Sequence, residues 1–258
     1  MKARTKLRVF SLFMALCLMV TILPLTAQAN SSEGDTGGIF PLPDPPTGGN
    51  IHAPYVTGYE DGTFRPDSPI TRAEATVVLW RMLPIFQQQP YSTHAHYSDV
   101  PDGLWYSYAI NRMAELHILD GYEDGTFRPD EPITREQFAV IVCKFFEFDE
   151  RLSNNPFSDV EESWAYNYIL TIVEHGLMIG YEDGAFHPKE ALSRAEAITV
   201  INRVLNRQTR TENIPEERHK LYSDLLDTHW AFQDIIEASA MHAFADDDEY
   251  GYELWIAW

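Results

Sequence analysis

Three arginines occupy the same local context at widely separated places in the chain. They are Arg72, Arg135 and Arg194, and each follows a Thr or Ser and precedes, by two residues, a Glu or Gln. The hydroxyl residue and the Glu or Gln three positions later form a capping box, which places each arginine at the first position of a helix. The partial positive charge of a helix N-terminus disfavours an exposed cation there by about 0.3–1 kcal/mol. We therefore expect each arginine to have a compensating negative partner.

Two kinds of partner would explain these arginines. A bound anion is one, because helix N-termini present free N–H groups and an arginine adds a bidentate donor for a carboxylate. A salt bridge to a carboxylate of an adjacent segment is the other. The residue types and spacing by themselves leave both interpretations open.

The elements that must position the arginines recur with them. Apolar residues follow each arginine at i, i+3, i+4, i+7 and i+8, starting from Ala75, Phe138 and Ala197, which is the stripe of an amphipathic helix. A Gly-Tyr-Glu-Asp-Gly loop precedes each helix, and its Asp-Gly pair is typical of a turn with positive φ. The loops begin 63 and then 59 residues apart. Such a period indicates units that must pack on one another to bury their apolar faces.

A second motif contains a Ser-Asp pair and ends in a tryptophan that is predicted to begin another helix. Its aspartates are Asp99, Asp159 and Asp224, and its tryptophans are Trp105, Trp164 and Trp230. The chain begins with a loop and capped helix that lack a Trp helix, and it ends with a Trp helix that lacks a capped helix. We therefore predict that the two half units pair, with the Trp230 helix beside the first capped helix.

The bulk composition bounds the class of protein. The net charge is −20, which makes nucleic-acid binding an unfavourable interpretation. Residues 1–29 combine a basic start, an apolar run and an Ala-Gln-Ala site, which is typical of a cleaved signal peptide. Without that segment, only Cys143 remains as a thiol and no intramolecular disulfide can form. A secreted chain without disulfides must rely on its hydrophobic core.

The predicted divisions follow from these patterns. They are a signal peptide (1–29), a flexible linker (30–54), a first repeat of loop and capped helix (55–97), a second repeat (98–157), a third repeat (158–222) and a C-terminal Trp-helix half unit with its tail (223–258).

The three motifs together resemble the S-layer homology domain of bacterial surface proteins. The resemblance covers about residues 55–244 and rests on motifs that recur in one order at matching spacing. It implies an all-α, closed pseudo-threefold domain of three repeats that binds secondary cell wall polysaccharide, an anionic and typically pyruvylated polymer, in grooves between repeats. The arginine of the Thr-Arg-Ala-Glu motif is the family's chief anion contact, which carries to Arg72, Arg135 and Arg194.

The remaining motif residues have two interpretations each. The three tryptophans could stack on a sugar ring or anchor the core at a helix start. The three aspartates could accept hydrogen bonds from turn N–H groups or from sugar hydroxyls. The third repeat departs most from the pattern, with Ser193 for Thr, Ala185 for Thr and His187 for Arg. The sequence therefore predicts that Arg72 and Arg135 contribute more to binding than Arg194, and that exposed arginines can be replaced without unfolding the domain.

The resulting functional hypothesis is a non-catalytic protein of the cell wall or S-layer. Its partners would be the wall polysaccharide and other surface-layer proteins, with no membrane contact after signal cleavage and no cofactor. No catalytic constellation or metal-ligand motif is predicted, because the loop lacks the spacing of a calcium-binding EF-hand. The alternatives are an envelope protein-interaction scaffold without glycan binding and a hydrolase with a cryptic site.

Overall fold

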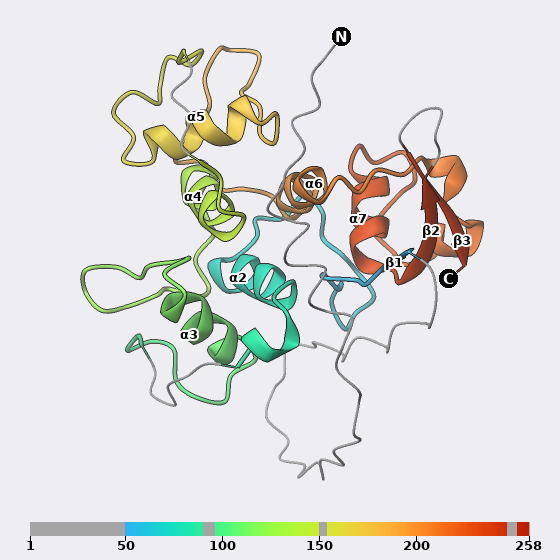
Figure 1. The fold of residues 1–258 in the computed structure, drawn as a ribbon, viewed down its shortest axis with the longest axis horizontal. Helices are drawn as coiled ribbons and strands as arrows, with labels where there is room; N and C mark the ends of the chain where they lie inside the picture. The colour runs from blue at the N-terminus through green and yellow to red at the C-terminus, as the bar shows by residue number, and fades with distance from the viewer. Residues whose placement is uncertain (1–49, 90–95, 150–153, 247–251, 258) are drawn as a thin grey trace. The chain divides into compact units, whose positions relative to one another are not determined.

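The computed structural model describes residues 50–89, 96–149, 154–246 and 252–257. Its elements are mostly helical, as predicted, and are drawn in Figure 1. In chain order they are β1 (Asn50–His52), α2 (Arg72–Arg81), the 3-10 helix η1 (Ile85–Gln87), α3 (Ser107–Glu115), α4 (Arg135–Phe145), α5 (Tyr166–Glu174), α6 (Arg194–Leu205), the 3-10 helices η2 (Thr211–Asn213) and η3 (Glu216–Lys220), α7 (Phe232–Ser239), β2 (His242–Asp246) and β3 (Glu253–Ala257).

The capped helices α2, α4 and α6 begin where the capping boxes predict. In each, the Thr or Ser side chain accepts a hydrogen bond from the backbone three residues later, and the Glu or Gln side chain there accepts one from the cap backbone. The exchange satisfies two N–H groups that a helix start would otherwise leave unpaired. The helix boundaries are therefore fixed locally by the sequence.

Each capped helix packs against the Trp helix that follows it: α2 against α3, α4 against α5, and α6 against α7. The prediction that the Trp230 helix lies beside the first capped helix is thus wrong in its partner, since α7 packs on α6. Thr199 and Asn202 of α6 hydrogen-bond to Asp234 of α7, and the two helices bury apolar residues beside these bonds.

The three units meet through a cycle of backbone hydrogen bonds. Ile70 N–H donates to the Leu192 carbonyl, Leu192 N–H to the Ile133 carbonyl, and Ile133 N–H to the Ile70 carbonyl, each at 3.0 Å. All three side chains are fully buried. The residue before each capping box thus contributes both an apolar side chain to the core and a backbone link to the other two units.

The first and last parts of the fold are joined by contacts that repeat those inside the middle units. Asp99 accepts from the backbone N–H groups of Phe127 and Arg128, and Asp224 accepts in the same way, at 2.7 Å, from those of Phe64 and Arg65. The C-terminal Ser-Asp segment therefore holds the N-terminal loop, although the two are about 160 residues apart. The predicted pairing of half units is realised through this loop.

A small antiparallel sheet of order β1-β2-β3 accompanies α7. His52 and His242 are register partners between β1 and β2, and Phe244 and Trp255 are partners between β2 and β3. The prediction of a flexible linker over residues 30–54 is wrong at its C-terminal end, because residues 50–52 form strand β1. In the C-terminal tail, residues 242–246 and 253–257 form strands β2 and β3. The signal peptide and residues 30–49 lie outside the described residues.

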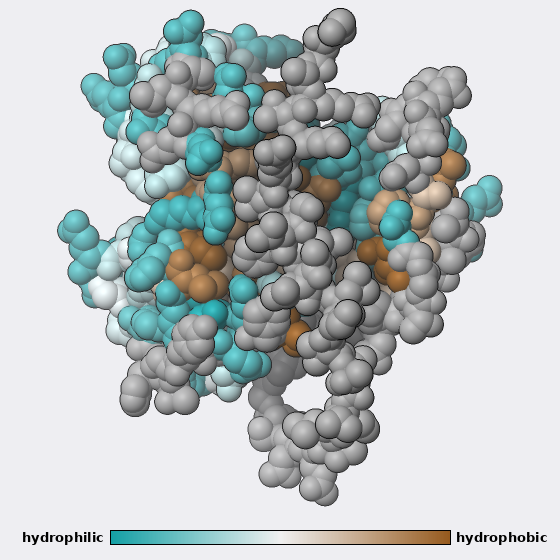
Figure 2. All heavy atoms as spheres, viewed as in Figure 1, coloured by the Kyte–Doolittle hydropathy of each residue, from teal (hydrophilic) through white to brown (hydrophobic). Residues whose placement is uncertain are grey.

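Hydrophilic residues predominate on the face of the described residues drawn in Figure 2, with smaller hydrophobic areas between them. In the described part of the chain, no helix combines the length and apolarity needed to cross a membrane.

Candidate functional site

The three predicted arginines lie in equivalent sites, each built by a helix start from one repeat and a loop from another. The first site comprises Arg72 with Tyr122 and Gln137, the second Arg135 with Tyr181 and Glu196, and the third Arg194 with Tyr59 and Glu74. The tyrosine is the second residue of each Gly-Tyr-Glu-Asp-Gly loop. Its threefold recurrence in the sequence was the signal that could have identified it.

The arginines are buried, which corrects the expectation that they are exposed. Their exposed fractions are 5%, 4% and 4% for Arg72, Arg135 and Arg194. The Arg72 Nε donates to the Phe127 carbonyl at 2.8 Å, and its guanidinium lies 4.4 Å from the Phe127 ring centre and 5.0 Å from that of Tyr122. Repeating this arrangement, Arg135 and Arg194 lie over a Tyr and a Phe of the loop that receives them. Burial arises because the covering loop belongs to a different repeat.

The helix-start N–H groups are already bonded, which removes one premise of the anion interpretation. Arg72 N–H donates to the Glu131 carbonyl and Ala73 N–H to the Pro129 carbonyl, each at 2.9 Å. The same pair of bonds recurs at Arg135 and at Arg194. An anion at these sites would therefore meet the arginine side chain and the tyrosine, without free backbone donors.

Two of the three arginines have the salt bridge that the alternative interpretation expected. Arg135 Nη1 lies 3.4 Å from Glu196 Oε1, and Arg194 Nη1 lies 3.1 Å from Glu74 Oε1. In the first site the equivalent position is Gln137, which carries no charge, and its amide donates to the Tyr122 hydroxyl at 3.3 Å. Within the described residues no ion pair joins Arg72 to a carboxylate. The first site therefore has a net positive charge, whereas the other two are internally neutralised.

The protonation behaviour follows from the same contacts. Burial lowers the pKa of Arg72, with Tyr122 and Glu131 acting in the opposite direction. In the third site, burial together with the hydrogen bond to Glu74 outweighs the nearby Arg194 charge and raises the pKa of Tyr59 to about 12. The Tyr59 hydroxyl donates that bond to Glu74 at 2.6 Å and is a neutral donor at physiological pH.

The predicted aspartates are engaged with the backbone. Both carboxylate oxygens of Asp159 accept N–H groups, from Phe186 and His187 at 2.8 Å, as those of Asp99 and Asp224 do in their own loops. This arrangement matches the turn-holding interpretation. The aspartates lie at the loop of each repeat and fix its backbone.

The predicted tryptophans differ in exposure. Trp105 is half-buried, whereas Trp164 and Trp230 are 65% and 58% exposed. Trp230 lines a cleft together with Arg135, Glu196 and Arg203. The structure thus brings one predicted tryptophan to the edge of one arginine site, on a surface open to solvent.

The fold consists of three helical repeats that are joined by a cycle of backbone hydrogen bonds, and each repeat carries one buried arginine. These features define a helical repeat-domain protein. The S-layer homology domain family matches residues 55–76, 96–139 and 156–198. The chain is therefore an S-layer homology domain protein with three repeats.

Curated relatives agree with that assignment. Cell surface glycoprotein 1 of Acetivibrio thermocellus is 35% identical over 212 residues, which cover 78% of this chain and 9% of that protein. The cellulosome-anchoring protein of the same organism is 34% identical over 219 residues, covering 82% of this chain and 48% of that protein. S-layer protein EA1 of Bacillus anthracis is 29% identical over 135 residues, covering 52% and 15% respectively. This chain spans about half or less of the length of these relatives.

Proposed function

We propose that this protein is a non-catalytic module that anchors to the bacterial cell wall by binding the anionic secondary wall polysaccharide through its arginine sites. Its family and the surface, anchoring and S-layer relatives locate it at the cell surface, in the wall or S-layer. Other surface-layer proteins are further partners. The polymer's pyruvyl carboxylates supply the negative charge that an arginine with aromatic neighbours can receive.

The observation that carries the proposal is the uncompensated charge of the first site. Arg72 is buried beneath Tyr122 and Phe127, and Gln137 stands where the other repeats have a glutamate. A buried cation without a carboxylate partner is costly, and an arriving carboxylate would remove that cost. The first site is therefore the preferred anion site, ahead of those of Arg135 and Arg194. This order revises the ranking that motif intactness had suggested.

An aromatic surface at the same site would complete a sugar-binding groove. Trp230 lines the cleft of the second site. Trp164 is the equivalent residue one repeat earlier, and it is exposed just before helix α5, which packs on α4. By this repeat relation Trp164 borders the first site and offers a face on which a sugar ring can stack. The three aspartates position the loops and contribute to binding through them.

The proposal can be tested by giving position 137 the glutamate that the other two repeats carry at the equivalent position. Gln137→Glu keeps the capping box, because glutamate serves the same role at positions 74 and 196, and it gives Arg72 a carboxylate. We expect sedimentation of the variant with purified cell walls to weaken about tenfold to a hundredfold, since a charge-assisted hydrogen bond is worth about 1.5–3 kcal/mol.

Two controls accompany that experiment. Lys189→Ala removes an exposed positive charge from the third loop and should leave sedimentation unchanged. Walls stripped of their non-peptidoglycan polymer should no longer retain the wild-type protein. Retention on stripped walls would favour the protein-interaction scaffold, and full retention of Gln137→Glu would remove the first site from the proposal.

A further inference from the structure

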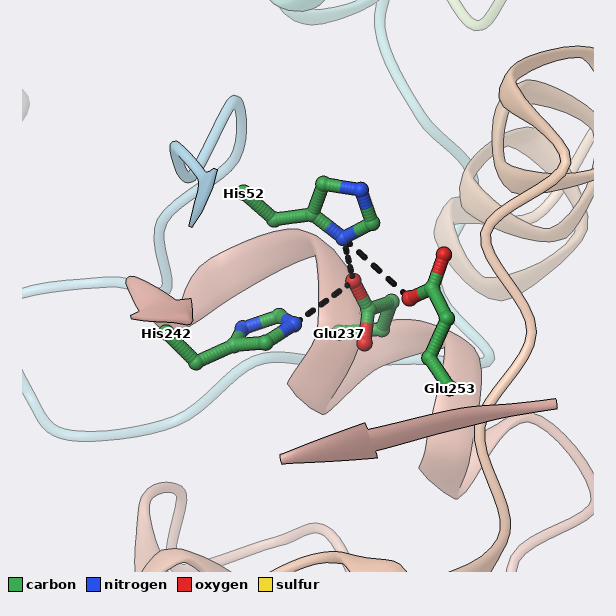
Figure 3. A group of neighbouring side chains, drawn as sticks. All are labelled: His52, Glu237, His242 and Glu253. Carbon is green, nitrogen blue, oxygen red and sulfur yellow. Dashed lines mark hydrogen bonds and ion pairs between the residues drawn. The ribbon is translucent and has the colours of Figure 1, made fainter. Parts of the chain in front are cut away.

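Four ionisable side chains converge between the sheet and α7, away from the arginine sites. They are His52 of β1, Glu237 of α7, His242 of β2 and Glu253 of β3, and Figure 3 shows their polar ends facing one another. One ligating atom from each can be chosen so that all four lie within 4.8 Å of one another. No sequence pattern predicts this cluster, because His52 and Glu237 are 185 residues apart and the four residues form no ligand-spacing motif.

The sheet register creates the cluster. His52 and His242 are directly paired across β1 and β2, so their side chains lie on the same face. Glu253 and Trp255 are two residues apart on β3, so their side chains share a face of the sheet. The His242 ring lies on the same face, because it stacks on the Trp255 ring with the ring centres 3.7 Å apart. Glu237 approaches from α7 and completes the group. Each ligand therefore comes from a different element.

The distances between the polar atoms are short. His52 Nδ1 lies 2.6 Å from Glu237 Oε1 and 3.3 Å from Glu253 Oε2, and His242 Nε2 lies 3.1 Å from Glu237 Oε1. Ligand atoms around a tetrahedral zinc ion, with bonds of about 2.0–2.2 Å, lie roughly 3.3–3.6 Å apart. Small side-chain adjustments would bring the four atoms to that spacing.

Two of these atoms are buried and lie within ion-pair distance of a neighbour, but neither makes a well-aligned hydrogen bond. His242 is 0% exposed and Glu253 is 7% exposed, yet His242 Nε2 and Glu253 Oε2 make no hydrogen bond of acceptable geometry. Buried polar atoms nearly always make such hydrogen bonds. Both atoms are among those that converge on the same point.

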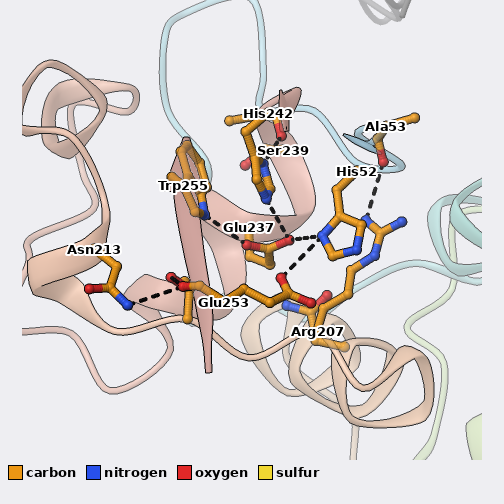
Figure 4. A network of polar contacts seen from close by, with 12 residues as sticks. His52, Ala53, Arg207, Asn213, Glu237, Ser239, His242, Glu253 and Trp255 are labelled. Atoms are coloured by element: carbon orange, nitrogen blue, oxygen red, sulfur yellow. Dashed lines mark hydrogen bonds and ion pairs between the residues drawn. The ribbon is translucent and has the colours of Figure 1, made fainter. Parts of the chain in front are cut away.

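The surrounding contacts orient the side chains as metal ligands are usually oriented. His242 Nδ1 lies 3.0 Å from the Ala240 carbonyl, which fixes its proton on Nδ1 and leaves the lone pair on Nε2 facing the cluster. Trp255 Nε1 donates to Glu237 Oε2 at 3.1 Å, which holds the other oxygen toward the histidines. Figure 4 shows this outer layer, including Arg207, whose Nη1 donates to the Ala53 carbonyl.

We infer that His52, Glu237, His242 and Glu253 form a structural zinc site. Two imidazoles and two carboxylates are a four-ligand set that suits Zn²⁺, and the ion would balance the two buried carboxylates. A cleft lined by Arg207, Glu237 and Tyr252 borders the cluster and provides a route of entry. The ion would fasten β1, immediately before the first repeat, to α7 and the C-terminal strands, and so join the two ends of the repeat domain.

The test is a zinc titration of the full chain, expressed without a polyhistidine tag and stripped of metal by a chelator. We expect one Zn²⁺ per chain, bound at about 1 µM or tighter, with slower hydrogen exchange in β1 after binding. Co²⁺ in place of Zn²⁺ should give the intense visible absorption of a tetrahedral nitrogen–oxygen site. These measurements on the wild-type chain need no variant to fold.

Variants then assign the ligands. His52→Gln, on the half-buried strand β1, and His242→Gln should each weaken zinc binding by at least about 100-fold, since even changes behind a ligand cost 10–100-fold. His117→Asn is the matched control, because His117 is exposed and adopts a positive φ that asparagine tolerates. The absence of saturable zinc binding in the wild-type chain, or binding unaltered in His52→Gln, would overturn the inference and leave a metal-free network of histidine–glutamate ion pairs.

Discussion

At the scale of single residues, equivalent positions in the three repeats carry different charges and so have different properties. The last position of the capping box is Glu74, Gln137 or Glu196 in the three repeats. Because Gln137 is uncharged, Arg72 has no carboxylate partner there. The capping-box pattern predicted a helix-capping role for this position, which is confirmed. Its second role, toward an arginine of another repeat, depends on a contact across about 60 residues. Local patterns cannot report such a contact.

The aspartate of the loop offers a pH-dependent prediction. Asp61 and Asp124 each accept from the hydroxyl and N–H of the Thr two positions on and from the arginine four positions on, which lowers the pKa of both carboxyls from 3.8 to about 2. The contribution of these bonds to stability is present above pH 3.8 and is lost as the pH falls through about 2.

Carbon-detected NMR titration of the carboxyl groups measures this directly. We expect midpoints near 2 for Asp61 and Asp124, and Thr63→Val should move that of Asp61 upward while leaving Asp124 unchanged. A midpoint of Asp61 near its usual value in the wild-type chain would show that the loop bonds do not persist in solution.

At the scale of elements, helix starts were predictable and helix neighbours were not. Thr71, Thr134 and Ser193 cap their helices as the sequence indicates, because capping depends on residues within one turn. The partner of α7 was assigned wrongly, since the packing of one helix on another depends on the whole arrangement of apolar faces. The strand at residues 50–52 was also missed, because its pairing partner lies at residues 242–244.

The third repeat provides a natural control for the caps. Thr71→Ala should destabilise the fold by about 0.5–2 kcal/mol, because the Glu74 N–H loses its acceptor. Thr71→Ser should cost much less, since Ser193 performs the same role in α6. Urea unfolding measures both values, and equal losses for the two variants would contradict the capping assignment.

At the scale of the whole repeat domain, the sequence frame of half, full, full and half units predicted that its ends would be joined. The joining contacts are those of Asp224 with the first loop and the aromatic packing of Tyr222 against Gly58, where an added Cβ would lie 2.4 Å from the ring. The equivalent glycines pack on Tyr97 and Phe157. The first glycine of each loop is therefore required for the close approach of an aromatic ring.

Asp224→Asn tests whether this junction holds the first loop. The substitution removes one of the two acceptor oxygens for the Phe64 and Arg65 N–H groups, so hydrogen exchange at these amides should accelerate. Exchange at the second loop should be unaffected, because Asp99 holds it separately. Asp227→Asn, an exposed neighbour, serves as the control, and identical exchange in the two variants would argue against the junction.

The central claim is that the first site receives a carboxylate of the wall polymer. Isothermal calorimetry of the full chain with fragments of the wall polysaccharide, before and after chemical removal of the pyruvyl groups, tests it most directly. We expect binding to the pyruvylated fragment and a loss of about tenfold to a hundredfold after the groups are removed. Equal affinity for the two fragments would contradict the account.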